Sequence, residues 1–186
     1  MNKLCFSLLI TLISFGATRA QSIPALDKSP MDMSTYPANY AGMKAQGKPV
    51  DPLIARIIYS RPQKNNRVIF GDLVEYNKVW RFGANENTEL EFFTDVKINN
   101  VKVKKGRYVV FVVPSETTWT IVINKDLNEW GSFRYNMSSD IVRVTLPVQK
   151  TTEIAENFYI LFEKATTGFS MVAGWDNVKI TLPISM

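Results

Sequence analysis

The sequence predicts an all-β fold, a two-layered and jelly-roll-like β-sandwich of about ten short, mostly antiparallel strands. Apolar and polar residues alternate along several short segments, and turn-forming residues separate those segments. No segment carries the apolar period of a long helix, whereas a parallel α/β sheet would need crossover helices. A closed barrel is the alternative architecture. A propeller or solenoid is disfavoured because the sequence has no repeat of fixed period.

Residues 1–20 are predicted to be a signal peptide. Lys3 precedes an apolar run, and small residues around Ala20 form the expected cleavage site. The run is too short to span a bilayer, and no later apolar run approaches the roughly 20 residues that a spanning helix needs. We therefore expect a secreted or periplasmic protein without a membrane span.

Residues 21–52 are predicted to form an extended N-terminal arm. This segment is rich in Pro, Met, Ala and Gly and has no sustained period, a pattern typical of turns and not of a core element. One β-sandwich domain is expected to follow over residues 53–186.

The strands of this domain are predicted from two-residue alternation or from short apolar runs that Gly or Pro ends. Residues 53–60 alternate until Pro62. Residues 96–103 fit a tight hairpin, because asparagines at its tip tolerate the positive φ of the turn. Residues 108–113 are apolar at nearly every position, as in a central strand covered on both faces. Further strands are expected at residues 68–70, 88–93, 119–123, 141–146, 158–162, 169–175 and 178–182.

The residue inventory excludes several kinds of chemistry. Without the leader, which holds the only cysteine, the chain has neither cysteine nor histidine. Thiol or imidazole catalysis and the usual zinc sites therefore cannot form. Asp126 and Asn128 begin like a calcium loop, but Trp130 and Met137 occupy two positions that must coordinate the ion. We expect no metal and no cofactor.

The charge pattern gives no indication of a nucleic-acid partner. The net charge is +5, and most cations are interleaved with acids. A nucleic-acid-binding domain usually has a concentrated basic stripe. The strongest cluster, at residues 97–107, flanks the predicted hairpin and is typical of a solvated strand end.

The best candidate for a binding site is the segment 80–91. An indole beside a guanidinium suits a sugar or a carboxylate, through apolar stacking and paired hydrogen bonds. The alternative, which we favour, is that Trp80 fills the core and Arg81 pairs with Glu89 or Glu91, because buried charges need partners. The candidate ligand-binding residues are Trp80, Arg81, Asn85, Glu86, Glu89, Glu91, Arg61 and Arg67.

Several of these residues have a plain structural interpretation as well. Arg61 and Arg67 bracket a turn and either join the cluster or lie as solvated charges at its rim. Trp119, Trp130 and Trp175 lie on or beside apolar strands, and all three are predicted to pack in the core.

Five segments resemble a known family. They are SPMDMSTYPANY (29–40), YSRPQKNNRVIFGDLVEYNKVWRFGANENTEL (59–90), KKGRYVVFVVP (104–114), WTIVINKDLNEWGSFRYN (119–136) and GWDNVKITLP (174–183). Together they resemble the bacterial family named domain of unknown function 2911, over nearly the whole chain beyond the leader. The resemblance implies a secreted β-rich domain and supplies no catalytic residue.

The sequence departs from that family's usual pattern in two places. Asn65-Asn66-Arg67 stands where the family tends to have Lys-Gly-Arg, which keeps a residue that tolerates left-handed backbone. Phe82 stands where a small or polar residue is common, and it is expected to narrow any pocket beside Arg81.

Three functions stay open at this point. The favoured one is a non-catalytic sandwich that binds a small polar ligand, a glycan or a partner protein near residues 80–91. The second is a hydrolase that uses two carboxylates, because acids about 5 to 10 Å apart can cleave glycosidic bonds. The third is an assembly module whose arm docks on another chain, and the sequence does not determine the oligomeric state. The carboxylates available to a hydrolase are Asp72, Glu86, Glu89 and Glu91.

Overall fold

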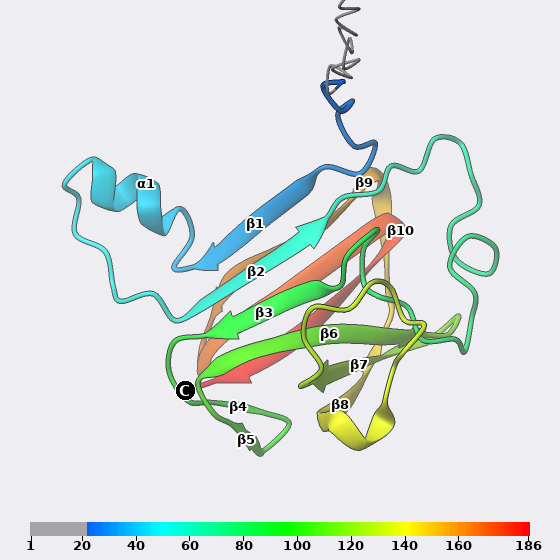
Figure 1. The fold of residues 1–186 in the computed structure, drawn as a ribbon. Helices are drawn as coiled ribbons and strands as arrows, with labels where there is room; N and C mark the ends of the chain where they lie inside the picture. The colour runs from blue at the N-terminus through cyan, green and yellow to red at the C-terminus, as the bar shows by residue number, and fades with distance from the viewer. Residues whose placement is uncertain (1–21) are drawn as a thin grey trace, which may run out of the picture.

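The structure, a computed structural model, describes residues 22–186. The predicted signal peptide, residues 1–20, lies outside the described residues. The described chain is nearly all β, and its strands form two antiparallel sheets that do not close into a barrel (Figure 1). The predicted all-β, two-layered fold is therefore confirmed.

The larger sheet has six strands in the order β1-β2-β3-β6-β7-β8. The smaller sheet has four strands in the order β5-β4-β10-β9 and lies behind the larger one in Figure 1. The strands of the larger sheet are β1 (Met31–Tyr36), β2 (Ala55–Ser60), β3 (Thr88–Phe92), β6 (Gly106–Pro114), β7 (Thr118–Asn124) and β8 (Asp140–Pro147). Those of the smaller sheet are β4 (Val96–Ile98), β5 (Val101–Val103), β9 (Gln149–Ala165) and β10 (Gly168–Ser185).

The main core lies between the two sheets and follows from the alternation along each strand. In β3, Thr88, Leu90 and Phe92 are buried, while the two intervening glutamates are only half-buried. Trp119 of β7 and Trp175 of β10 come from different sheets, and each is 1% exposed within this core. The alternating sequence thus fixes which face of each strand turns inward.

The central strand β6 is covered on both faces, as predicted. A second small cluster forms on its outer face from Val109, Phe111 and Val122. The segment between β7 and β8 covers this cluster, and the ring of Tyr135 meets that of Phe111 edge to face at 5.1 Å. This segment, residues 125–139, therefore has a packing role in addition to connecting two strands (Figure 1).

The N-terminal arm contains a strand of the larger sheet that the sequence did not indicate. Strand β1 pairs antiparallel with β2, from Met31 opposite Ser60 to Tyr36 opposite Ala55. The ring of Tyr36 stacks on Phe169 of β10 at 4.4 Å. The arm was expected to be extended and to hold no core element, and none of the residues of β1 is buried. The segment nevertheless forms an edge strand, because backbone pairing holds it against β2 and its polar residues give no strand pattern in the sequence. A short helix, α1 (Tyr40–Ala45), follows.

Two other strand predictions need correction. Residues 68–70 form no strand, only an isolated bridge from Phe70 to Val74. The two strands expected at 169–175 and 178–182 are one strand, β10, whose register shifts between Gly174 and Val178. The predicted hairpin is confirmed, since its tip residues Asn99 and Asn100 have φ values of 48° and 64°. Within residues 22–186, no helix has the length and apolar character needed to cross a membrane.

Candidate functional site

The candidate site lies in the long connection between β2 and β3, which runs along the right side of Figure 1. The backbone of Trp80 fixes this connection to the sheet. Its N–H donates to the carbonyl of Val112 at 2.7 Å, and its carbonyl accepts from Val112 N–H at 2.9 Å. Trp80 therefore pairs with β6 at Val112, two residues further along β6 than Val110, which lies opposite the first residue of β3.

The indole of Trp80 is half-buried, packing against the core while it lines a cavity. Its ring lies 5.2 Å from the ring of Phe158 and 6.1 Å from that of Trp175. The ring nitrogen donates to the carbonyl of Gly83 at 3.1 Å, so the polar atom of the indole is satisfied inside the protein. Trp80 also lines a cavity of about 300 Å³.

This cavity, which we call the arginine pocket, brings together four of the eight candidate residues. Its walls combine two cations, an amide and several apolar side chains, and no aspartate or glutamate lines it. Its lining residues are Ser29, Pro62, Arg67, Leu73, Val74, Trp80, Arg81, Gly83, Ala84, Asn85 and Trp175.

The pairing predicted for Arg81 is wrong. Glu89 pairs with Arg107, and Glu91 pairs with Arg56 at 2.5 Å. The physical reason is the strand register, because Glu91 lies directly opposite both of these arginines on the neighbouring strands β2 and β6. Cross-strand neighbours reach the carboxylates before a side chain from the preceding loop can.

Two further candidate residues also lie outside the arginine pocket. Arg61 donates to Asp32 at 2.9 Å and to the carbonyl of Phe158 at 3.1 Å, so its guanidinium ties β1 and β9 to the end of β2. Glu86 is exposed, and its backbone forms an isolated bridge with Trp130.

Arg81 is held in place by a carbonyl and an aromatic ring. Its Nη1 donates to the carbonyl oxygen of Asn85 at 2.9 Å, and its Cζ lies 5.9 Å from the centre of the Phe133 ring. Burial lowers the pKa of Arg81 from its usual value, although an arginine still keeps its charge. Among residues 22–186, no carboxylate forms an ion pair with it.

Gly131 makes the close approach to Arg81 possible. A β-carbon at this position would lie 3.2 Å from Cζ of Arg81 and 3.0 Å from the ring of Phe133. The residue also has a φ of 68°, which glycine adopts without strain. Gly131 thus allows residues 125–139 to lie against the guanidinium.

Arg67 is oriented by the turn that precedes it. Asn65 and Asn66 have φ values of 48° and 57°, the left-handed conformation that asparagine tolerates. This turn directs two carbonyls at the guanidinium, which donates to Lys64 at 3.0 Å and to Gln63. In the part of the chain that the structure describes, Arg67 also has no carboxylate partner.

Phe82 does not narrow the arginine pocket, contrary to expectation. Its side chain is fully buried and meets the rings of Trp80 at 5.5 Å and Phe158 at 5.2 Å. Its φ of 57° is unusual for a bulky residue, and such strain persists only where the surroundings impose it. The hydroxyl of Thr88 donates to the Phe82 carbonyl at 2.6 Å and helps to hold this turn.

The prediction that all three remaining tryptophans pack in the core is wrong for Trp130. Its side chain is 55% exposed, and that of Phe133 is 82% exposed. Both residues lie in residues 125–139, the segment that also contacts Arg81. The sequence offered one signal for this, the turn-forming residues Asn128 and Gly131 on either side of Trp130. Both adopt positive φ in the structure.

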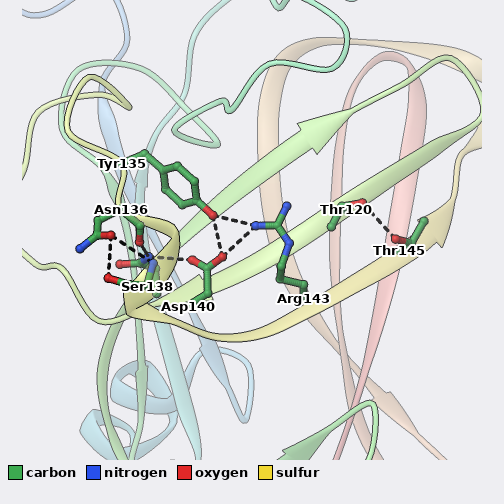
Figure 2. A network of polar contacts seen from close by, with 8 residues as sticks. Thr120, Tyr135, Asn136, Ser138, Asp140, Arg143 and Thr145 are labelled. Atoms are coloured by element: carbon green, nitrogen blue, oxygen red, sulfur yellow. Dashed lines mark hydrogen bonds and ion pairs between the residues drawn. The ribbon is translucent and has the colours of Figure 1, made fainter.

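Asp140 anchors the base of this segment (Figure 2). Its carboxylate accepts from the hydroxyl of Tyr135 at 2.6 Å, from the amide of Asn124 at 2.8 Å and from Arg143 at 2.8 Å. Burial and the bond to Asp140 raise the pKa of Tyr135 to about 12, so its hydroxyl remains a donor at neutral pH. The network holds residues 125–139 against the outer face of the larger sheet.

The described residues contain no group of three or more carboxylates that could hold a metal ion. The arginine pocket itself offers nitrogen donors and apolar walls. Such a lining is suited to an anion or a polar organic molecule, because Arg and Asn side chains supply the donors.

The fold and the pocket thus define a two-layered β-sandwich with an arginine-lined cavity formed mainly by its long β2–β3 connection. Residues 44–184 match the family described as Protein of unknown function (DUF2911), and the chain belongs to that family. No curated protein and no solved structure matches the chain. The resemblance noted in the sequence is therefore confirmed.

A double-mutant cycle checks the carboxylate partners found here. The coupling between Arg81→Gln and either Glu89→Gln or Glu91→Gln is expected to be near zero, because the glutamates bind other arginines. Arg107→Gln and Glu89→Gln should show a weak coupling that disappears at high salt, as exposed ion pairs do. Urea unfolding of the single and double variants measures both values. A coupling of several kcal/mol to Arg81 would contradict this assignment.

Proposed function

We propose that this protein is a non-catalytic binding protein that acts outside the cytoplasm and holds a small polar ligand in the arginine pocket. The observation that carries the proposal is the meeting of Trp80, Arg81, Asn85 and Arg67 at one cavity of about 300 Å³. Cavities from roughly 300 Å³ upward, with apolar walls and a few directed polar groups, are typical of small-molecule sites. The expected location rests on the predicted signal peptide alone.

The competing hydrolase hypothesis has less support. It requires two carboxylates that face each other across an open space. Glu89 and Glu91 each bind an arginine, and the arginine pocket has no acidic lining residue. Binding is therefore the function that the arrangement of these side chains favours.

A thermal-shift screen of the purified protein tests the proposal. The panel contains sugars, amino acids, organic acids and nucleosides, and unfolding is followed by tryptophan fluorescence. A ligand at 100 times its Kd should add about 2.7 kcal/mol of stability. For a chain of this size, each 1 kcal/mol raises Tm by roughly 2–4 °C.

Ala84→Leu serves as the blocking variant, because Ala84 lines the arginine pocket and a leucine there fills part of it. Ala155→Leu is the matched control, since Ala155 is equally half-buried but lies in β9, outside this pocket. We expect the stabilising ligand to lose its effect on Ala84→Leu and to keep it on Ala155→Leu. A panel without any stabilising compound, or one that stabilises both variants equally, would overturn the proposal.

A further inference from the structure

The lining of the arginine pocket carries a net positive charge. Two of its lining residues, Arg67 and Arg81, are cations, and none is an anion. The other lining residues include the apolar side chains of Leu73 and Val74 and the indole of Trp80. A ligand that complements these walls has an apolar body and one negative charge.

Among residues 22–186, no carboxylate balances the charge of Arg81. The two carboxylates nearest to it in sequence within β3 are occupied by arginines of the neighbouring strands. The guanidinium is half-buried, so it has lost part of its hydration, and a cation in that position is stabilised by an anion that binds there. The pKa of Arg81, which burial lowers, agrees with this interpretation.

The guanidinium is also preorganised for such an anion. One N–H group donates to the carbonyl of Asn85, and the Cζ of Arg81 lies 5.9 Å from the centre of the Phe133 ring. Within residues 22–186, the other N–H groups of Arg81 have no protein acceptor. Arginine presents its N–H groups as a planar fork that matches both oxygens of a carboxylate.

We propose that the arginine pocket binds a small organic acid, whose carboxylate pairs with Arg81 and whose apolar body packs against Leu73 and Trp80. Arg67 adds positive charge at the rim of the pocket. This inference rests on the proposed function and adds to it the chemical class of the ligand. Inorganic anions and neutral polar molecules are the classes that the experiment must separate from organic acids.

Phenylacetate, phenylacetamide and inorganic phosphate serve as probes. Phenylacetate and phenylacetamide share the same apolar body and differ in charge, and phosphate carries charge without an apolar body. Isothermal titration calorimetry should give phenylacetate at least about tenfold tighter binding than phenylacetamide, as expected for a charge-assisted paired contact. The affinity for phenylacetate should fall as sodium chloride is raised. Phosphate should bind more weakly than phenylacetate.

Substitutions of single arginines test whether Arg81 is the residue that binds the carboxylate. Arg81→Gln should weaken phenylacetate binding at least about tenfold and leave phenylacetamide binding unchanged. Arg134→Gln makes the same change at an exposed arginine outside the pocket and should leave both affinities unchanged. Circular dichroism and Tm without ligand show that each variant is folded. If Arg81→Gln does not fold, Arg81→Lys replaces it and should lose several-fold in affinity, because lysine keeps the charge but not the fork.

The outcomes separate the two proposals. Equal binding of phenylacetate and phenylacetamide, abolished by Ala84→Leu, would overturn the organic-acid inference and leave the binding function standing. Phosphate binding as tight as phenylacetate binding would also overturn it. Undiminished phenylacetate binding by folded Arg81→Gln would overturn the role of Arg81. Failure of all three probes, together with a screen that yields no ligand, would overturn both proposals.

Discussion

Replacing Trp80 with alanine is expected to lower the free energy of unfolding by about 3–5 kcal/mol, the usual cost of removing a large aromatic side chain from a core. The indole contacts aromatic rings from both sheets and donates to the carbonyl of Gly83. Its loss leaves a cavity between layers that cannot collapse freely, because Phe158 and Trp175 are held by their own strands. Urea unfolding monitored by circular dichroism measures the change.

Trp130→Ala is the matched control for this prediction. It removes the same side chain from a position that is 55% exposed. The expected loss is within about 0.5 kcal/mol, the range of surface substitutions. Similar losses for the two variants would contradict the assignment of Trp80 to the core and of Trp130 to the surface.

Replacing Asp140 with alanine is expected to cost about 2–3 kcal/mol. The carboxylate is 8% exposed and accepts from three side chains, and hydrogen bonds to a charged group are worth about 1.5–3 kcal/mol each. Removing it leaves the amide of Asn124, which is fully buried, with only the carbonyl of Asn136 as its acceptor. Thermal and urea unfolding give the loss in stability.

The same substitution should loosen residues 125–139 before the rest of the molecule. Amide hydrogen exchange is expected to speed up in this segment, because its anchor at the base of the loop is lost. Asp72→Ala is the control, since Asp72 is exposed and forms no ion pair among the described residues. Unchanged exchange in residues 125–139 of the Asp140 variant would show that the network in Figure 2 does not hold the segment.

The fold was largely predictable because alternation and turn residues are local signals. Strand β3 and the hairpin at Asn99-Asn100 follow directly from them. Strand β1 was missed because an edge strand held by backbone pairing needs no apolar stripe, and its sequence alternates only weakly. Residues 68–70 were overpredicted because an apolar triplet beside a glycine packs equally well in a loop.

The site was predictable in position but not in its contacts. The polarity of the segment after Trp80 pointed to Arg81 and Asn85, and both line the arginine pocket. The partners of Glu89 and Glu91 depend on the register between strands, which no local pattern gives. The contact between Phe133 and Arg81 could not be predicted either, because it joins residues far apart in the chain through a loop of irregular backbone.

A titration with phenylacetate followed by ¹H–¹⁵N correlation spectra of the labelled protein tests the arginine pocket most directly. The indole N–H of Trp80, which donates to Gly83, reports on one wall, and the backbone amide of Asn85 reports on another. We predict that both signals shift along one saturating curve, while the indole N–H signals of Trp119 and Trp130 stay in place. Shifts centred on the groove beside Met33 and Tyr40, or no shift of Trp80 and Asn85 at saturation, would contradict the account.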